Sequence, residues 1–596
     1  MNRTLTLTAA PHSPDHATGR DLSLPGVGLT EIFALALLMT VANAFKPLHI
    51  DDTAYYAYAR QIAEHPLDPY RFTILWYQTW QPAQEVLAPP VLPYWWAMGL
   101  RLFGDRPVLW KLWLFPFCFL FVAALQALFK RFAHGLERPL LWMTVLSPAF
   151  LPHLNLMLDI PALALMLTAL VLFMRSLERS SFLRAVTAGV VAGLAMQTKY
   201  TALLAAPVFF WLALTTTPGA SQRGRRWRGL ALWFVATAMM AGVFVGWESF
   251  LVWRHPEDGS HFLYHLHANG SAPWLDRLTT ELTTLPGLLG GMAAGIGLLG
   301  LVALTARRWV LAVGVAWLVL TYGAVVCLGA QFMAWGHLDV PFRHSALNLG
   351  GPFPLEASLF GALGLGMVIV LGIVCVRLFR AHPSSRGPRP WFLIGWLAIE
   401  VAGYFVLSPF PAVRRVLGIV IVATLLVGQL ASLTCQTPAA RRLVWAVAIL
   451  NMGVGVFYTA VDWSAARASQ TAAVQAAAWI KAQGGGGTVW YTGHWGFQFY
   501  AEREGMEPLV PGETWLVAGD WLVVPDAGIN QQEARLDQRS LERVETVRVA
   551  SLVPCTTVPR AYGAYYDSGA GAPLLHQDGP QVEVTIYRVR RTHLCR

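Results

Sequence analysis

Three aspartates are the residues of this sequence best placed to do chemistry. Asp51 and Asp52 are adjacent and follow an apolar run at residues 29–45, and Asp159 begins another apolar run in LMLDIPALALML. Adjacent carboxylates repel each other, so the pKa of one can rise enough for it to act as a general base. Ionisable groups at a membrane edge are functional by default. The alternatives are a solvated Asp pair at a helix exit and, at Asp159, a carboxylate that simply favours a helix N-terminus.

Three cations at the ends of other apolar runs could bind an anion beside these carboxylates. Lys199 lies between two runs with no acidic residue near it in sequence, and Arg414 and Arg415 precede a run in SPFPAVRRVLG. Lys suits a phosphate as a point charge, and the planar fork of Arg matches phosphate oxygens. Lys199 could instead extend its ammonium to the membrane interface. The cations therefore predict either a phosphate site or interfacial anchors.

Four histidines crowd one polar segment, HPEDGSHFLYHLHANG. His261 and His265 share a face if this segment is helical, and with a carboxylate they could hold a divalent metal. Histidines in a polar loop need no metal, so both interpretations stay open. Glu248 and Glu400 lie inside apolar runs, where each is either a hydrogen-bonded structural carboxylate or faces the same cavity as the aspartates.

The composition indicates the elements that must position these residues. The chain has 596 residues, of which 55% are hydrophobic and only 13% charged, with a mean hydropathy of +0.47. Soluble domains are about a quarter charged, so a soluble enzyme is excluded and a chain embedded in a membrane is favoured. The net charge is +10, but residues 463–596 hold 12 Lys+Arg against 13 Asp+Glu. A basic surplus in the membrane part points to orientation signals and not to a nucleic-acid partner.

Apolar runs of membrane-spanning length predict an α-helical polytopic membrane protein with about 13 transmembrane helices. The expected spans are 29–45, 107–130, 139–152, 156–174, 183–198, 200–216, 230–253, 286–306, 309–328, 355–376, 391–407, 415–434 and 443–461. Residues 1–28 are polar and predict a disordered cytoplasmic leader. The membrane core then occupies 29–462, with a large loop at 46–106 that contains two short amphipathic helices, in TAYYAYARQIAE and PPVLPYWWAMGLRLFG.

Every second loop between these runs is basic, which predicts the orientation of the chain. By the positive-inside rule these loops and the N-terminus are cytoplasmic, and an odd number of spans places the C-terminus outside the cytoplasm. The aspartates, Lys199 and the Arg414–Arg415 pair then share the outer side. The arginine pair breaks the rule there, which favours an anionic ligand over an orientation signal.

Residues 463–596 predict a small extracytoplasmic α/β domain. TAAVQAAAWIKAQ has a helical pattern, and GTVWYTGHWGFQFYAERE and DWLVVPD alternate as strands do. This domain either binds the acceptor or covers the cavity. Cys555 and Cys595 both lie in it, where an oxidising compartment would permit a disulfide. The sequence does not supply the distance between them, so a disulfide and two free thiols are equally open.

Five segments, in this order, resemble the integral-membrane glycosyltransferases of the GT-C class, and in particular family 39, which includes protein O-mannosyltransferases and lipid A aminoarabinose transferases. The segments are HIDDTAYYAYARQIAEHP, APPVLPYWWAMGLRLFG, LMLDIPALALML, GLAMQTKYTALLAAP and SPFPAVRRVLG. The match covers about residues 29–215 well and 408–434 loosely. One departure is Ala88, where relatives often have Lys, so the substrate of this chain can differ from theirs.

The resemblance implies a hexosyl or pentosyl transfer, with inversion, from a polyprenyl-phosphate sugar to an envelope lipid, glycan or protein, in a bacterial plasma membrane. Asp51 looks like the catalytic base, Asp52 takes the place of the family's Glu, and Asp159 looks like the second acidic site residue, which contacts acceptor or metal. Lys199 with Arg414 or Arg415 look like cations for the donor phosphate. Four tryptophans of the 46–106 loop could stack on a sugar ring, although an interfacial aromatic belt accounts for them equally: Trp76, Trp80, Trp95 and Trp96.

Two other functions remain open from the sequence. A transporter or flippase of lipid-linked sugars would also have many spans and charged residues at a membrane edge. Transporters generally place their sites near the midplane, often in repeated halves, and no repeat is evident here. A catalytically inactive GT-C relative would serve as a binding protein. No cofactor is predicted firmly, and a divalent metal is the one candidate.

Overall fold

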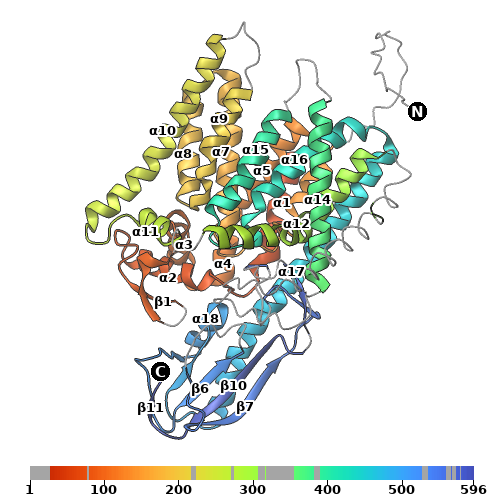
Figure 1. Ribbon diagram of the computed structural model, residues 1–596. Helices are drawn as coiled ribbons and strands as arrows, with labels where there is room; N and C mark the ends of the chain where they lie inside the picture. Colours follow the sequence, from red (N-terminus) through yellow and green to blue (C-terminus); the bar gives the residue numbers. More distant parts are fainter. Residues whose placement is uncertain are drawn as a thin grey trace, which may run out of the picture.

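The computed structural model describes residues 27–76, 79–86, 88–215, 223–269, 274–305, 314, 316, 355–380, 390–526, 535–558, 565–566, 572–577 and 579–595. It shows a bundle of long helices, a layer of short helices and one β-hairpin across one end of that bundle, and a C-terminal domain beyond this layer (Figure 1). The predicted leader, apart from residues 27–28, and nearly all of the predicted span 309–328 lie outside the described residues.

Eight helices of the described ranges are long and apolar enough to cross a membrane. They are Pro107–Phe132, which joins α4 (Pro107–Leu112) to α5 (Phe115–Phe132), then α7 (Asp159–Arg179), Arg226–Arg254 within α10 (Arg223–Arg254), Arg277–Leu304 within α12 (Trp274–Leu304), Glu356–Arg380 within α14 (Leu355–Arg380), α15 (Pro390–Leu407), α16 (Leu417–Thr434) and α17 (Pro438–Ala482). Three apolar helices are shorter, namely α1 (Leu29–Ala44), α8 (Phe182–Met196) and Tyr200–Thr215, which joins η2 (Tyr200–Leu204) to α9 (Ala205–Thr215). The expected count of 13 is not confirmed by this set.

One predicted span has a different structure. Residues 139–152 were expected to cross the membrane, but α6 (Glu137–Val145) has only nine residues, and the chain continues to Leu158 without a further helix. Pro148 and Pro152 interrupt the helical hydrogen bonding here, because proline has no backbone N–H and its ring clashes with the preceding turn. The irregular segment is buried among the helices.

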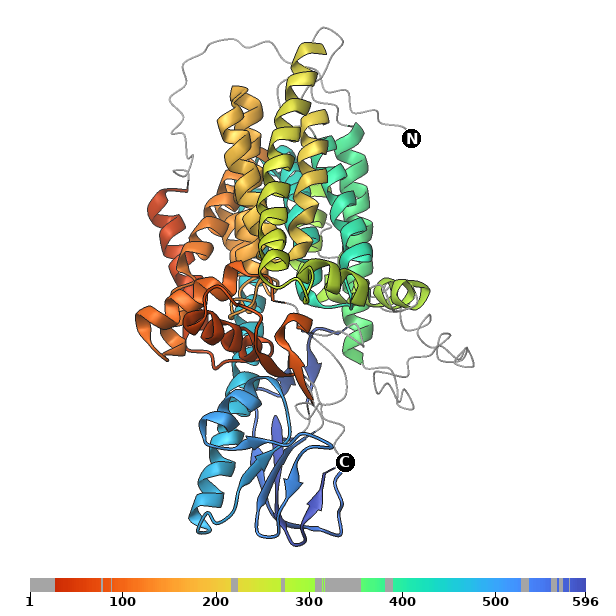
Figure 2. The same cartoon turned by 90° about the vertical axis from the view of Figure 1, so that its left-hand side faces the viewer.

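Two of the basic residues expected in cytoplasmic loops, Arg131 and Arg138, lie at one end of the bundle. Arg138 forms a salt bridge of 2.8 Å with Glu31 in the first turn of α1, and Arg131 at the end of α5 pairs with Glu178 at the end of α7. The short-helix layer lies at the opposite end (Figure 2). These two arginines therefore lie at the end of the bundle away from the candidate site, and the orientation of the chain in the membrane remains a prediction.

The short-helix layer contains the two amphipathic helices that the 46–106 loop predicted. They are α2 (Asp52–Glu64) and α3 (Val91–Phe103), and both bury one face and expose the other. Between them the chain forms a hairpin of β1 (Thr73–Trp76) and β2 (Thr79–Pro82) with the register Leu75 opposite Trp80. The layer also includes α11 (His261–Asn269).

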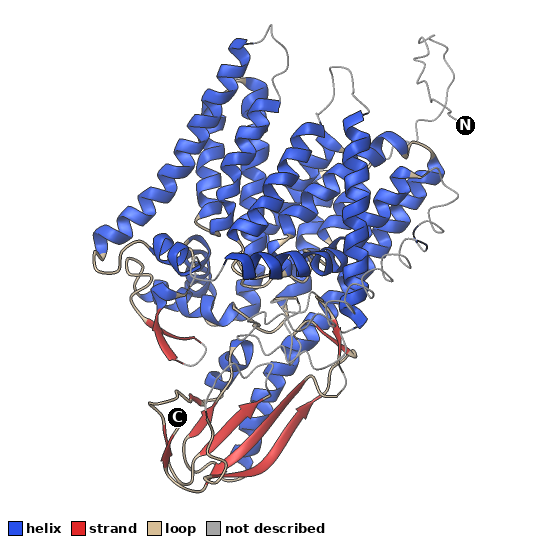
Figure 3. Ribbon diagram, in the orientation of Figure 1, coloured by secondary structure: helices blue, strands red, loops and turns tan. Residues whose placement is uncertain are grey.

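The C-terminal domain is a small mixed sheet packed on one helix. The strands are β3 (Val489–Tyr491), β4 (Glu507–Pro508), β6 (Trp521–Pro525), β7 (Leu541–Val549) and β10 (Val582–Val589), in the order β4-β3-β6-β10-β7 (Figure 3). The strand β3 is parallel to β4 and β6, whereas β10 is antiparallel to β6 and β7. Alternate residues of β10 are buried, as expected for a strand with one face on the core.

The helix α17 connects this domain to the bundle without a break. It has 45 residues, which corresponds to roughly 67 Å at 1.5 Å per residue, more than twice the thickness of a bilayer core. The boundary expected at residues 462 and 463 therefore falls inside one continuous helix. In its second half small residues are buried against α18 (Trp495–Arg503) and the sheet: Ala465, Ala466, Ala468, Ala472, Ala473 and Ala476.

The two cysteines of this domain are free thiols, so the disulfide considered from the sequence is not formed. Cys555 lies in β8 (Cys555–Thr556), which pairs with β9 (Leu575–His576). Cys595 follows β11 (His593–Leu594), which pairs with β5 (Trp515–Leu516), and packs in a separate apolar cluster with Leu509 and Leu516. The two thiols belong to different sheets, a tertiary separation that spacing along the chain does not reveal.

A buried ion pair holds the start of the short-helix layer to α17. The ammonium of Lys46 lies 2.7 Å from a carboxylate oxygen of Asp462, and both side chains are fully buried. Asp462 also accepts hydrogen bonds from the hydroxyls of Thr557 at 2.9 Å and Tyr566 at 2.9 and 3.0 Å. These contacts join the membrane core, α17 and the C-terminal domain at one point.

Replacing Lys46 with Met is expected to destabilise the protein by about 3–5 kcal/mol, because it leaves the carboxylate of Asp462 buried without its counter-ion. The measurement is the unfolding midpoint of the purified protein in detergent. Lys481→Met is the matched control, since Lys481 is exposed near the end of the same helix. Equal midpoints for the two variants would show that the buried pair contributes nothing.

Candidate active site

Four separate segments bring the predicted site residues to the same end of the bundle. Asp51 occupies the N-cap position of α2, and Asp159 is the first residue of α7. Lys199 lies in the turn between α8 and η2, and Arg414 and Arg415 lie in the short helix η4 (Val413–Arg415) that precedes α16. The structure therefore gathers residues that are more than 360 positions apart in the chain.

The turn before Asp51 has an unusual backbone. Ile50 has a φ of 50°, in the left-handed region that a β-branched residue rarely adopts, and it is buried. Such a conformation costs about 1–3 kcal/mol and persists only where its surroundings hold it, which is common at functional sites. Asp51 begins α2 directly after this turn.

Two ion pairs link the carboxylates to the cations. A guanidinium nitrogen of Arg414 lies 2.6 Å from a carboxylate oxygen of Asp51, and the ammonium of Lys199 pairs with the carboxylate of Asp159. Arg415 forms no ion pair with any carboxylate in the described part of the chain; its guanidinium lies 5.1 Å from the ring centre of Phe410. Within the same ranges, the buried Nε–H groups of Arg414 and Arg415 have no hydrogen-bond acceptor.

The charges of this cluster do not balance. At this end of the site three cations lie beside the two carboxylates of Asp51 and Asp159, so the ion-paired cluster carries one excess positive charge. It also contains two buried N–H donors that lack acceptors among the described residues. An unpaired buried charge and an unsatisfied buried donor are both costly, and each is relieved by a bound anion. The arrangement is that of an anion site for a group that brings both negative charge and acceptor oxygens.

Burial and neighbouring charges act differently on the three cations. Burial lowers the pKa of Arg415 to about 10, with Arg414 adding repulsion. Burial also lowers the pKa of Arg414, but Asp51 and Asp159 outweigh this effect and the net pKa is raised. Burial lowers the pKa of Lys199 to about 8 against the attraction of Asp159. All three groups are therefore charged at neutral pH, and Lys199 is the one closest to losing its proton.

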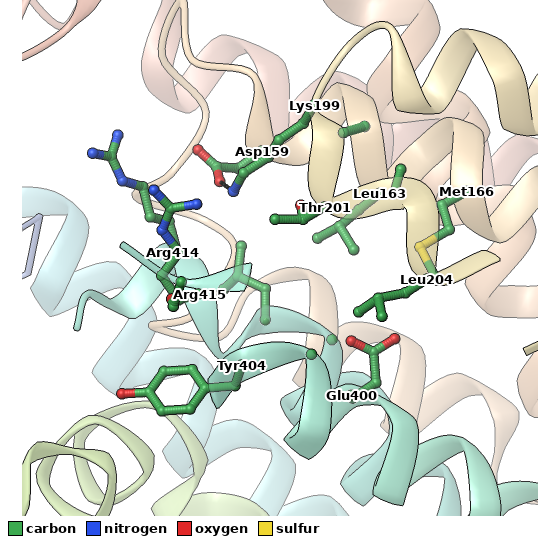
Figure 4. Close-up of a pocket in the computed structure, with 16 residues that line it drawn as sticks. Asp159, Leu163, Met166, Lys199, Thr201, Leu204, Glu400, Tyr404, Arg414 and Arg415 are labelled. Atoms are coloured by element: carbon green, nitrogen blue, oxygen red, sulfur yellow. Dashed lines mark hydrogen bonds and ion pairs between the residues drawn. The ribbon is translucent and has the colours of Figure 1, made fainter. Parts of the chain in front are cut away.

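These residues line a cavity with about 600 Å³ of empty space, part of it open solvent, and its two ends differ in chemistry (Figure 4). Asp159, Lys199 and the two arginines gather at one end. Toward the other end Figure 4 shows the apolar side chains of Leu163, Met166 and Leu204, from α7 and η2, together with the carboxylate of Glu400 from α15. A ligand with a charged head and an apolar tail matches this gradient.

The cavity also contains residues that the sequence did not assign to the site. Tyr404, Ser408 and Thr201 line it, and no local motif distinguishes them from other polar residues at helix ends. Of the two glutamates left open, Glu400 lines the cavity and accepts a hydrogen bond of 2.9 Å from the indole of Trp396. Glu248 is instead a structural carboxylate, which accepts hydrogen bonds from Ser260 at 2.6 Å and from the backbone of Phe262 at 3.1 Å.

Asp52 faces away from this cavity. Its side chain is fully buried and accepts a hydrogen bond of 2.9 Å from the backbone N–H of His49. Burial raises its pKa to about 6, while the nearby Lys111 opposes the rise. The ammonium of Lys111 is itself buried and donates to the carbonyl of Lys46. Asp51 and Asp52 therefore lie in different environments. Lys111, a lysine inside an apolar run, was the sequence signal that could have indicated the buried partner of Asp52.

The four tryptophans separate into two groups. Trp95 stacks on Trp113 at 4.8 Å, and each indole donates to the backbone carbonyl of the other residue. Trp96 is 2% exposed and packs against Tyr55. These two are therefore occupied in the packing of α3. Trp76 and Trp80 line a second cavity, next to the C-terminal domain, and Trp80 is 47% exposed.

The two histidines considered as metal ligands are adjacent in α11. Their ring centres lie 4.5 Å apart, but His261 is hydrogen-bonded to the hydroxyl of Tyr200 at 2.6 Å and His265 to the carbonyl of Gln84 at 3.2 Å. Within the ranges that the structure describes, the group of side chains that could hold a metal is a different one, His255, Glu257 and Asp258. Its two carboxylates are exposed, and Arg71 lies 3.1 Å from Glu257.

The lowered pKa of Lys199 predicts how anion binding depends on pH. Because the ammonium loses its proton as the pH rises through about 8, affinity for a phosphate head group is expected to fall above that pH. The charged groups around Lys199 are Asp159, Arg414 and Arg415, and a phosphate monoester titrates lower, near 6. The measurement is the affinity for polyprenyl phosphate between pH 6 and 10. Lys199→Arg should remove the decrease near pH 8; a decrease that persists in this variant would assign it to another group.

Comparison with protein-family models finds no match to this chain, and comparison with curated proteins finds none either. The solved structures to which it is similar include ArnT from Cupriavidus metallidurans bound to undecaprenyl phosphate, with a TM-score of 0.39 and 14% identity over 83% of this chain and 92% of that one. They also include the oligosaccharyltransferase AglB from Archaeoglobus fulgidus in complex with an inhibitory peptide and a dolichol-phosphate, with a TM-score of 0.38 and 13% identity over 73% of this chain and 55% of that one. An Archaeoglobus fulgidus oligosaccharyltransferase tethered to an acceptor peptide has a TM-score of 0.44 and 13% identity over 80% and 63%. Because the identities are 13–14% and the TM-scores lie below 0.5, we infer the chemistry of the site from its own geometry.

Proposed function

We propose that this protein is a membrane glycosyltransferase that moves a sugar from a polyprenyl-phosphate donor to an envelope acceptor, with inversion at the anomeric carbon. The observation that carries the proposal is the excess positive charge of the ion-paired cluster beside the carboxylate of Asp51, with two buried guanidinium N–H groups that lack acceptors among the described residues. A lipid phosphate supplies the missing charge and acceptors, and the apolar end of the cavity fits the start of its tail.

In this mechanism the donor phosphate binds Arg415 and Lys199 and takes up the free donor groups of Arg414. Asp51 removes the proton of an acceptor hydroxyl, and the resulting oxygen attacks the anomeric carbon from the side opposite the phosphate. The new C–O bond forms as the bond to the phosphate oxygen breaks, so the polyprenyl phosphate leaves with an additional negative charge. The arginines stabilise this charge in the transition state more than in the bound donor.

Arg414 has a double role in this proposal. It pairs with Asp51 at 2.6 Å, which orients the carboxylate. When the phosphate binds, the guanidinium is shared between two anions, so its ion pair with Asp51 weakens and the carboxylate is free to contact the acceptor hydroxyl. Asp159 is proposed to fix the ammonium of Lys199 toward the same phosphate and to line the path of the acceptor.

The test is sugar transfer by the purified protein in lipid, offered radiolabelled polyprenyl-phosphate sugars together with envelope extract. Transfer of label to an extract component, with release of polyprenyl phosphate, is the expected result. A chelator added to the same assay reports whether a divalent metal contributes. Donor binding or translocation across the bilayer without transfer would overturn the enzyme and favour a transporter of lipid-linked sugars.

The proposal also includes the location of the reaction. With the N-terminus in the cytoplasm, the site and the C-terminal domain lie on the outer side of a bacterial plasma membrane, where envelope acceptors are exposed. Cysteine labelling tests this orientation. The variant has Cys555→Ser and Cys595→Ser together with Arg442→Cys at an exposed position, and a membrane-impermeant thiol reagent should not reach residue 442 in intact cells. Labelling at Arg442 in intact cells would reverse the orientation.

A further inference from the structure

A second cavity lies beside α2 and shares no lining residue with the cavity that contains Asp159 and Lys199. Its walls are α2, the β1–β2 hairpin and the segment that contains α18, and it is open to solvent, with about 870 Å³ of empty space. We call it the α2–α18 groove. Figure 1 places these elements between the membrane helices and the C-terminal sheet, so the groove lies outside the bundle. It runs from Thr53 to Glu64 of α2, a length of roughly 16 Å at 1.5 Å per residue.

The C-terminal domain builds one wall of this groove through a hydrogen-bonded chain of side chains. His494 bonds to Gln498 at 3.0 Å, and the amide of Gln498 donates to Oε1 of Glu502 at 3.0 Å. The hydroxyl of Tyr491 donates to the same oxygen at 2.8 Å. Both bonds fall on Oε1, while the exposed Glu502 lines the groove, so its second carboxylate oxygen can accept from a ligand.

Aromatic rings form the opposite wall. Trp76 lies edge to face against His494 at 4.6 Å, Trp80 is 47% exposed, and Tyr56 and Phe72 complete the lining. Trp76 is half-buried, so Trp80 offers the exposed indole ring. Such a ring beside carboxylate and amide groups is typical of surfaces that bind amphipathic ligands. A pyranose ring is such a ligand, since its C–H faces pack on aromatic rings and its hydroxyls bond to the planar polar groups around them.

The charge of the groove opposes an anionic ligand. Glu64 and Glu502 outnumber Arg60, and burial lowers the pKa of His494 to about 4, so that its ring is neutral. This is the opposite of the lipid-phosphate cavity, where cations are in excess. The two cavities therefore differ in the class of ligand that they admit.

Asp51 is adjacent to the linings of both cavities. Its partner Arg414 lines the first, and Thr53, two residues along the chain, lines the second and donates a hydrogen bond of 2.7 Å to the carbonyl of Trp495. An acceptor in the α2–α18 groove would therefore meet Asp51 at the Thr53 end of the groove.

We infer that the α2–α18 groove binds the carbohydrate chain of the acceptor, with Trp76 and Trp80 stacking on its sugar rings and Glu502 and Gln498 bonding to its hydroxyls. This inference rests on the proposed function for its place in the reaction. It commits the acceptor to a glycan, free or attached to a lipid, and gives the C-terminal domain a role in acceptor binding.

The test is saturation-transfer NMR with the full-length protein in lipid nanodiscs and no donor. The probe is a set of size-fractionated, lipid-free oligosaccharides released from bacterial envelopes by mild acid. We expect at least one fraction to bind, and Trp80→Ala and Glu502→Gln each to weaken its binding by about tenfold. Trp515→Ala is the matched control, because Trp515 is a 59% exposed tryptophan of the C-terminal domain that does not line the groove.

Each outcome decides the inference. Binding that is weakened by both groove variants and not by the control supports it. Absence of binding by every fraction, equal binding in Trp80→Ala and Trp515→Ala, or binding of extended peptides in place of oligosaccharides overturns it. Because this assay contains no donor and no transfer step, a protein that binds glycans but transfers nothing would refute the proposed function alone. Undecaprenyl phosphate binding, measured on the same variants, should be unchanged by the groove substitutions.

Discussion

Replacing Asp51 with Asn should reduce sugar transfer by about 10²–10⁴-fold while leaving donor binding at least as strong as in the unmodified protein. The size of the loss is that of a general base removed from its proton-transfer step. Asn has the same shape but cannot accept the acceptor's proton. Donor binding should not weaken, because loss of the carboxylate releases Arg414 from its 2.6 Å ion pair and leaves the guanidinium free for the phosphate.

The measurement is a single-turnover transfer rate together with the dissociation constant for polyprenyl phosphate. Asp68→Asn is the control for charge loss in the same loop, since Asp68 pairs with Arg254 and His255 outside the cavity. A rate for Asp51→Asn within a few fold of that for Asp68→Asn would remove Asp51 from the role of base. Weaker donor binding in Asp51→Asn would contradict the competition between Asp51 and phosphate for Arg414.

Replacing Arg415 with Gln should weaken donor binding by about 10–100-fold and slow transfer further. Arg415 is the cation of the cluster with no carboxylate partner among the described residues, so its interaction with a phosphate is not offset by the loss of an existing pair. A hydrogen bond to a charged group contributes about 1.5–3 kcal/mol, and loss of a charge-stabilising donor from a transition state costs about 10²–10³-fold in rate.

Arg415→Lys separates charge from geometry. Lys retains the positive charge but not the planar fork, so donor binding should recover in part and transfer less. The control substitution is Arg442→Gln, because Arg442 is exposed and lies near the start of α17, away from the cavity. If Arg415→Gln binds polyprenyl phosphate as tightly as Arg442→Gln, the excess charge of the cavity is not used for the donor phosphate, and the proposed function loses its main support.

Much of the candidate site could be predicted because local chemistry was conspicuous there. Four of its residues are charged and lie at the ends of apolar runs: Asp159, Lys199, Arg414 and Arg415. A charge in such a place is energetically costly unless it has an ion-pair partner or binds a ligand. The structure brings all four into one cavity and places Asp51 against Arg414. The same reasoning could not find Tyr404, Ser408 or Thr201, which are ordinary residues for their positions until the helices are packed.

The sequence by itself determined that this is a helical membrane protein, because a chain with 13% charged residues and long apolar runs forms membrane helices. It also determined α2 and α3, whose amphipathic patterns are local. The tertiary structure alone decided that Asp51 and Asp52 face different environments and that Cys555 and Cys595 stay apart. It also decided that Trp95 and Trp96 pack inside while Trp76 and Trp80 line a groove. The physical reason is that neighbouring positions in a helix or turn point in different directions, and only the packing of distant segments determines what each direction meets.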